Sequence, residues 1–239
     1  MTQIKTAMVL AAGLGTRMRP LTDDRPKALV EVGGRTLIDH MIDRLKSAGV
    51  ERFVVNVHYF ADRLEAHLKS RSDVEIIISD EREKLLETGG GLKKARPLLS
   101  DDPVLVANID SVWIEDENQD RAIADMLVQW QPQNMDALLL LADMNRSSGF
   151  DGAGDFFLAD DQRLSFRGQA MSAPFNYMGV HITHPDIVAE VAEEAFSLTP
   201  IWRQKATAGR LFGARMQGDW MHVGDPAALD AAQARLKRT

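Results

Sequence analysis

The sequence contains no cysteine, and this absence excludes disulfide bridges, thiolate catalysis and metal sites built from cysteine. It also has no apolar run that approaches the length of a membrane span; the longest, at residues 137–142, suits a buried strand. Positive charge is in the minority, because 28 lysines and arginines stand against 35 aspartates and glutamates. The resulting formal charge of −7 argues against general binding to nucleic acid or to an anionic membrane. Since the N-terminus also lacks a signal-peptide pattern, we expect a cytoplasmic protein.

The composition is otherwise ordinary for a globular protein, with 45% hydrophobic and 26% charged residues among 239. A chain of this length can bury a full core and form one large α/β domain or two small ones. The sequence shows no internal repeat, no low-complexity linker and no clear domain boundary. We therefore expect a single domain over residues 1–239, without a C-terminal hexapeptide β-helix.

Strand and helix patterns alternate in the first half of the chain. Short apolar runs predict strands at residues 7–12, 53–57, 74–78 and 104–107. Helical spacing predicts a helix over 37–45 that Gly49 ends, a second helix containing Leu64 and Leu68, and a third that opens at 91–95. Such alternation implies right-handed crossovers, so we expect a Rossmann-like three-layer sandwich around a mainly parallel mixed sheet.

The second half of the chain is less regular. Strands are predicted at residues 137–142, 156–158, 176–183 and 211–216. We expect one helix after Pro185 and a terminal helix at 226–236, which has proline at its first turn. Ligands of parallel sheets gather at the carboxyl ends of the strands. Residues 13–27, 58–60, 80–88 and 108–113 fall at that edge, and we expect the functional site there.

One segment carries more information than the rest. It reads Leu10-Ala11-Ala12-Gly13-Leu14-Gly15-Thr16-Arg17-Met18-Arg19-Pro20 and is closed by Pro26-Lys27. Glycines let the backbone approach an anion, because no Cβ blocks the way. Arg17, Arg19 and Lys27 add positive charge against phosphate oxygens. The segment therefore predicts a triphosphate-binding loop, although its two glycines alone would equally suit a turn with solvated arginines, and its spacing matches neither the dinucleotide fingerprint nor the Walker loop.

With its prolines and the later lysine, this segment resembles the signature of the sugar-1-phosphate nucleotidyltransferases, L-A-A-G-x-G-T-R-x-x-P-L-T-x-x-x-P-K, at every fixed position. The resemblance implies a nucleotide-binding half at 1–115 and a sugar-phosphate-binding half at 116–239. It implies that an NTP and a sugar 1-phosphate give an NDP-sugar and pyrophosphate. It also implies catalytic roles for Arg17, Lys27 and Asp110, with Lys27 contacting the sugar phosphate. The implied nucleotide contacts are Leu10, Ala11, Ala12, Gly13, Gly15, Thr16, Arg17, Gly89, Gly90 and Asn108.

A second cluster reads Glu87-Thr88-Gly89-Gly90-Gly91. Three glycines that open a helix are expected to expose free amides, which hold an anion or read a base edge. A flexible turn at a helix start explains the same residues. The family resemblance assigns Gly90 and Gly89 to base and ribose contacts.

Asp110 follows the apolar strand predicted at 104–107, so its carboxylate is placed at the ligand edge. Hard divalent cations prefer oxygen ligands and keep waters and substrate phosphates. The residue therefore suits Mg²⁺, which the resemblance also implies; the alternative is an aspartate that caps a turn or helix.

A fourth cluster departs from the family pattern. The chain reads Trp220-Met221-His222-Val223-Gly224-Asp225, where relatives usually read W-x-D-V/I-G-T with a second Mg²⁺ ligand. Imidazole is a poorer partner for Mg²⁺ than carboxylate. Three interpretations stay open: His222 binds a metal such as Mn²⁺, Asp225 or Asp219 replaces the missing carboxylate, or activity is reduced. A histidine that merely bonds nearby backbone is an equal alternative.

The sugar side carries weaker signals. The resemblance implies that Asp155, Asn176 and Gly179 line a sugar pocket, although ordinary turn and strand residues would look the same. Ser197 stands where close relatives carry a lysine. Within the family, segments 87–91, 176–180 and 195–200 are most similar to uridylyltransferases of N-acetylmuramate 1-phosphate, with guanylyltransferases of mannose 1-phosphate second. Because His222 and Ser197 depart from the pattern, an impaired, nucleotide-binding regulatory protein is the rival from another class.

Overall fold

The computed structural model describes residues 4–116 and 121–238 of the chain. Its main sheet runs in the order β11-β10-β12-β6-β1-β4-β5, and β8 pairs with both β12 and β13. The parallel part of this sheet comprises β1 (Thr6–Leu10), β4 (Arg52–Val57), β5 (Glu75–Asp80) and β6 (Val104–Asn108). From β1 the chain proceeds outward through β4 to β5 and then returns to the other side of β1 as β6. This reversal of strand order is where ligands of such sheets bind.

The rest of the main sheet is mixed. It comprises β8 (Ala137–Asp143), β10 (Phe156–Leu158), β11 (Leu164–Phe166), β12 (Phe175–Thr183) and β13 (Leu211–Arg215). Strand β12 is antiparallel to both β6 and β8, whereas β13 is parallel to β8. The predicted mainly parallel, mixed sheet is confirmed.

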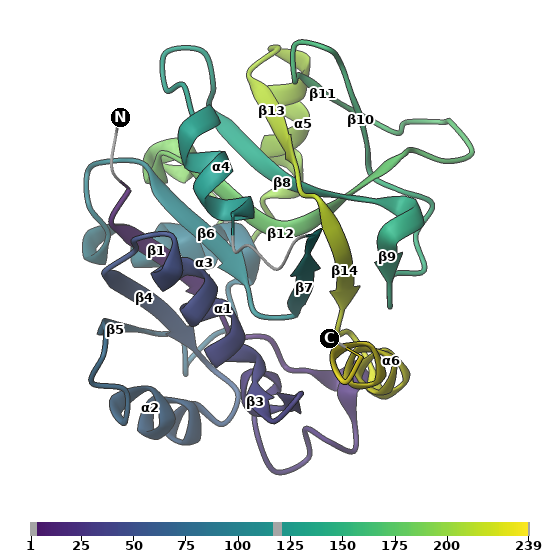
Figure 1. Cartoon of the computed structure of the whole chain (residues 1–239). Coiled ribbons are helices and arrows are strands. Elements are labelled where there is room, and N and C mark those ends of the chain that lie inside the picture. Colours follow the sequence, from purple (N-terminus) through teal and green to yellow (C-terminus); the bar gives the residue numbers. More distant parts are fainter. Residues whose placement is uncertain (1–3, 117–120, 239) are drawn as a thin grey trace.

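Helices cover both faces of the sheet, so the predicted three layers are present. They are α1 (Leu37–Ser47), α2 (Ala61–Lys69), α3 (Glu87–Ala95), α4 (Ala122–Gln129), α5 (Thr199–Thr207) and α6 (Pro226–Leu236). In Figure 1, α1 and α4 lie in front of the sheet, and α3 and α5 lie behind it. Each face of the sheet has its own hydrophobic core, and alternate side chains of β1 point into the two cores. Ala7 and Val9 belong to the core with α1 and α2, while Met8 belongs to the core with α3 and α5. This double burial explains why the strand is apolar from Ala7 to Leu10.

A small second sheet crosses the site end of the molecule. It pairs β14 (Gly218–His222) antiparallel to β7 (Ser111–Glu115) and parallel to β9 (Ser147–Ser148). Its register places His222 opposite Ser111, immediately after Asp110. A two-stranded hairpin, β2 (Glu31–Val32) and β3 (Arg35–Thr36), precedes α1. The sequence did not predict these pairings.

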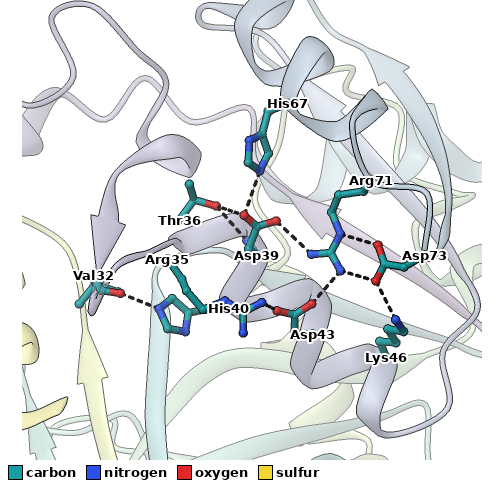
Figure 2. Close-up of polar contacts among 10 residues, drawn as sticks. All are labelled: Val32, Arg35, Thr36, Asp39, His40, Asp43, Lys46, His67, Arg71 and Asp73. Atoms are coloured by element: carbon teal, nitrogen blue, oxygen red, sulfur yellow. Dashed lines mark hydrogen bonds and ion pairs between the residues drawn. The ribbon is translucent and has the colours of Figure 1, made fainter. Parts of the chain in front are cut away.

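Figure 2 shows a polar network that joins α1 to the loop between α2 and β5. The Arg71 guanidinium donates to Asp39 Oδ1 at 3.0 Å, Asp43 Oδ1 at 2.7 Å and Asp73 Oδ1 at 3.1 Å. Only 12% of the Arg71 side chain is exposed. The Thr36 hydroxyl donates to Asp39 Oδ2 at 2.7 Å and accepts from the Asp39 N–H, which caps the start of α1. The network therefore fastens α1 to the loop that follows α2.

Most of the predicted elements are present, and the terminal helix matches residue for residue. The helix predicted after Pro185 is wrong, because the chain forms only a 3₁₀ turn at Pro185–Val188. This turn buries only Pro185 and Val188. The segment therefore lacks the apolar stripe that would hold a longer helix against the core. None of the described helices is long and apolar enough to cross a bilayer.

Candidate active site

A cavity of about 330 Å³ opens at the carboxyl ends of β1, β4, β5 and β6. It lies at the reversal of strand order, as predicted from the fold class. Its lining is Leu10, Ala11, Ala12, Gly13, Gly15, Thr16, Arg17, Lys27, Asn56, Glu81, Leu85, Glu87, Thr88, Asn108, Ile109, Asp110 and Gly224. The structure thus brings the first loop, Lys27 and Asp110 to one place.

The first loop presents backbone donors to this cavity. The N–H groups of Gly13, Gly15 and Thr16 donate to no other group in the described part of the chain. Successive free N–H groups in a turn form a concave site for anions. Because Arg17 lines the same cavity, the loop combines amide dipoles with a full positive charge.

Two glycines shape the loop in different ways. Gly15 has φ +62°, and a Cβ there would lie 3.0 Å from the Lys27 Cβ. Its carbonyl accepts from the Thr22 hydroxyl at 2.8 Å, which ties the turn to residue 22. Around Gly13, by contrast, a Cβ would meet no atom within 4 Å. Gly15 is therefore required by the fold, whereas the space beside Gly13 is open for a ligand.

Lys27 and Asp110 form an ion pair in the cavity wall. Lys27 Nζ lies 2.8 Å from Asp110 Oδ2, and the side chains are 11% and 22% exposed. Burial raises the pKa of Asp110. The charge of the Lys27 ammonium and, as a smaller effect, the nearby His222 outweigh burial and hold the pKa below its ordinary value. Asp110 is therefore an anion at neutral pH.

His222 lies beside this pair. Its Nδ1 is 4.0 Å from Asp110 Oδ2, and its ring packs near Phe150 and Trp220. Burial lowers the pKa of His222; Asp110 opposes this shift, and the charge of Lys27 adds to it. The imidazole is therefore neutral at pH 7, which is the form that binds metals.

The two carboxylates considered as replacements have other partners. Asp225 Oδ1 accepts from the Ala228 N–H at 2.9 Å and caps α6. Asp219 is ion-paired with Arg146 at 2.8 Å and with Arg235 at 2.7 Å. Neither residue lines the cavity.

Asp110 in the cavity wall and the adjacent His222 could together offer one carboxylate and one neutral imidazole to a cation. In the described ranges no group of three or more histidine or acidic side chains is arranged to hold a metal ion. Mg²⁺ is usually held by one or two carboxylates together with waters and substrate phosphates. This small donor set therefore fits a cation whose coordination is completed by the phosphates of a substrate. Imidazole is also a better ligand for softer ions such as Mn²⁺ than it is for Mg²⁺.

The second glycine cluster is used differently from what the sequence suggested. The expectation of free amides is wrong, because the N–H groups of Gly89 and Gly90 donate to the Phe196 carbonyl at 2.8 and 3.1 Å. A Cβ on Gly89 would lie 2.3 Å from the Phe196 ring. These glycines let α3 pack closely against the segment before α5, and Glu87 and Thr88 line the cavity in their place. A base contact by Gly89 or Gly90 stays a prediction.

The three predicted sugar-side residues do not line this cavity. Asp155 Oδ2 accepts from the Tyr177 N–H at 3.0 Å, and burial raises the Asp155 pKa. Asn176 is fully buried and donates to the Ser147 hydroxyl at 3.0 Å. Gly179 has φ +78°, and a Cβ there would lie 2.8 Å from Asn108 Nδ2. Gly179 therefore adjoins the site through Asn108, and the sugar contacts stay predictions.

Ser197, which stands in place of a family lysine, has a local role. Its hydroxyl accepts from the Thr199 N–H at 3.2 Å, at the start of α5. This hydrogen bond satisfies one of the free donors at the helix start.

Sequence reasoning missed several cavity residues, chiefly Asn56 and Glu81. Both are buried and polar, with exposed fractions of 2% and 0%. The signal available in the sequence was a single asparagine in the otherwise apolar run 53–57 of β4. Buried polar groups are almost always hydrogen-bonded, so such a residue marks a specific contact.

Comparison with known proteins agrees with this geometry. Residues 7–146 match the family model described as a MobA-like NTP transferase domain. The N-acetylmuramate alpha-1-phosphate uridylyltransferase of Caulobacter vibrioides is 55% identical over 97% of each chain. The enzyme of that name from Neisseria meningitidis is 35% identical over 95% of this chain and 96% of its own. The UTP-bound UGPase of Acinetobacter baumannii shares the fold, with a TM-score of 0.77 and 19% identity over 98% of this chain and 93% of its own.

Proposed function

The chain belongs to the MobA-like NTP transferase family, and on this premise we propose that it is a sugar-1-phosphate nucleotidyltransferase. It joins an NTP to a sugar 1-phosphate and releases an NDP-sugar and pyrophosphate. The pair we propose is UTP with N-acetylmuramate α-1-phosphate, because relatives at 55% and 35% identity carry that name. The observation that carries the proposal is one cavity lined by the free N–H groups of the first loop, Arg17 and the Lys27–Asp110 pair.

The reaction mainly requires that the two phosphates be aligned and that their negative charge be neutralised. An oxygen of the sugar phosphate attacks the α-phosphorus, and the bond from that phosphorus to the pyrophosphate oxygen breaks. In our proposal the N–H groups of Gly13, Gly15 and Thr16 hold the phosphate tail. Arg17 offsets the negative charge that grows on pyrophosphate, and Lys27 holds the α-phosphate beside its attacker.

Asp110 would hold the divalent cation, with His222 as the neighbouring donor. We propose Mg²⁺, with Mn²⁺ as the alternative that an imidazole ligand favours. Such a cation supplies positive charge to phosphate oxygens. Lys27 Nζ lies 2.8 Å from Asp110 Oδ2. The lysine and the cation would therefore compete for this carboxylate.

A pyrophosphate-release assay tests the proposal. UTP, GTP, CTP and dTTP are each combined with N-acetylmuramate 1-phosphate and with mannose 1-phosphate, first in Mg²⁺ and then in Mn²⁺. We expect the highest turnover from UTP with N-acetylmuramate 1-phosphate. Highest turnover from GTP with mannose 1-phosphate would instead assign the guanylyltransferase activity.

A nucleotide-binding regulatory protein is the second candidate function. It is favoured by His222, which stands where the family pattern has a carboxylate. Tight NTP binding without pyrophosphate release from any substrate pair, in either metal, would identify that function and contradict the enzyme.

A further inference from the structure

Asn56 and Glu81 form a buried polar pair in the wall of the cavity. Asn56 lies near the end of β4, and Glu81 directly follows β5. Asn56 Nδ2 donates to Glu81 Oε1 at 2.8 Å. No lysine, arginine or histidine in the described part of the chain lies within ion-pair distance of Glu81, so the pair is held by hydrogen bonds.

The remaining polar atoms of the pair bind two separate backbone segments. Asn56 Oδ1 accepts from the N–H groups of Ala11 and Ala12, at 2.6 and 3.2 Å. Glu81 Oε2 accepts from the Leu86 N–H at 3.3 Å. A carboxamide has one oxygen and one NH₂ group, so these two uses leave Asn56 a single orientation. Both Glu81 oxygens accept hydrogen bonds here, and this arrangement enforces that orientation.

On the side of α3 the pair has no free space around it. A Cβ on Gly91 would lie 2.9 Å from Glu81 Oε1 and 3.0 Å from Asn56 Nδ2. Helix α3 thus closes over the pair, and its missing side chain makes the space for it. In the loop, Ala11 and Ala12 come directly before the free N–H groups that begin at Gly13.

We propose that Asn56 and Glu81 are positioning residues that set the phosphate loop and the 85–88 wall at the separation that the nucleotide requires. The inference rests on the proposed nucleotidyltransferase function. Neither side chain needs to touch the reacting atoms, because the pair acts through the backbone of residues 11–12 on one side and 86 on the other.

The polarity of the pair allows a rescue experiment. In Asn56→Asp, a carboxylate replaces the amide and faces the Glu81 carboxylate without a donor between them. In Glu81→Gln, an amide cannot accept from both Asn56 Nδ2 and the Leu86 N–H, so two donors face each other. In the double variant, the new carboxylate at position 56 accepts from Ala11, Ala12 and the new amide, whose oxygen accepts from Leu86. All four hydrogen bonds are restored, and only the one between positions 56 and 81 has its polarity reversed.

The readout is KM for UTP in the pyrophosphate-release assay. We expect each single variant to raise KM about tenfold, and the double variant to return to within about threefold of the wild type. Ser79→Ala is the control, because Ser79 is buried on β5, two residues before Glu81, and its Oγ has no hydrogen-bond partner in the described residues. This control should keep the wild-type KM.

Amide hydrogen exchange provides a readout that is independent of activity. Exchange at Ala11 and Ala12 should accelerate in Glu81→Gln, although Glu81 makes no hydrogen bond to either residue, and should slow again in the double variant. Wild-type KM and wild-type exchange in both single variants would overturn the proposal. A double variant that is unfolded, or as impaired as Glu81→Gln, would overturn it as well. A wild-type protein without turnover would refute the proposed function, whereas the exchange pattern would still test the pair.

Discussion

Two carboxylates, Asp110 in the cavity and Asp39 between α1 and the neighbouring loop, both lie next to a basic side chain. Asp39 accepts from the Thr36 hydroxyl and the Arg71 guanidinium, and His67 Nε2 lies 3.0 Å away (Figure 2). Around Asp110, the Lys27 ammonium at 2.8 Å and His222 at 4.0 Å approach the same oxygen, and the residue borders open space. The comparison shows that a charge pair alone does not mark a site. A site is marked by charges and donors that the protein leaves available.

The same contrast holds for the donors. Arg71 directs its guanidinium to three carboxylates of the protein. The N–H groups of Gly13, Gly15 and Thr16 have no such partner within the described ranges. We therefore interpret the Asp39 network as a device for stability and the Asp110 surroundings as a device for ligand binding.

The largest expected effect is on turnover at the cavity. Arg17→Ala and Lys27→Ala should each lower kcat about 10²- to 10³-fold, because each removes a charge aimed at developing negative charge. Lys46→Ala removes a lysine from the α1 network, where Lys46 Nζ lies 2.7 Å from Asp73 Oδ2, and should leave kcat unchanged. Steady-state kinetics with UTP measure both. Equal effects of Lys27→Ala and Lys46→Ala on kcat would contradict the distinction between the cavity and the α1 network.

The second effect is on stability at the network. Arg71→Ala should lower the free energy of unfolding by about 3 kcal/mol, because it leaves several partly buried carboxylates without their partner. Urea unfolding measures this change, and kcat per folded molecule should not move. A loss below about 1 kcal/mol would mean that the network behaves like an exposed ion pair.

The two loop glycines provide a smaller, paired test. Gly15→Ala should lower the free energy of unfolding by about 1 kcal/mol or more, because the residue has φ +62° and no space for a Cβ. Gly13→Ala should leave the unfolding free energy unchanged, since the site is open, and should raise KM for UTP by obstructing the phosphates. Thermal unfolding and KM are measured on both variants. An unchanged KM in Gly13→Ala would show that no phosphate approaches that residue.

The smallest expected effect is the pH dependence of the Asp39 contribution. Burial raises the Asp39 pKa, but the hydrogen bonds from Thr36 and Arg71 outweigh burial and hold the pKa below its ordinary 3.8. A lowered folded-state pKa gives stability that is present above the unfolded pKa and is lost as the pH falls through the folded pKa. The stability difference between wild type and Asp39→Asn should therefore be constant near neutrality and shrink below about pH 4. A difference that grows on acidification would contradict this assignment.

Much of the fold could be predicted because burial leaves a local pattern. The apolar runs of β1, β4, β5 and β6 and the periodic face of α1 were predicted, with ends that shifted by a few residues. Helix α6 matched at both ends, since Asp225 caps it and Pro226 starts it. Helices α4 and α5 were missed; α5 buries only Ile201 and Trp202, so its apolar stripe is narrow.

The site was predictable where its chemistry is local in sequence. Gly13, Gly15, Arg17 and Lys27 lie within one segment, and Asp110 directly follows the end of a strand. The Asn56–Glu81 link and the approach of His222 to Asp110 could not be predicted in the same way. They depend on which strands become neighbours, and no local pattern encodes that pairing.

A crystal structure with a non-hydrolysable UTP analogue and Mg²⁺ tests most directly whether the cavity is the nucleotide site. We predict phosphate oxygens within hydrogen-bonding distance of the N–H groups of Gly13, Gly15 and Thr16, with the cation on the Asp110 carboxylate. A nucleotide bound elsewhere, with this cavity unchanged, would contradict the assignment.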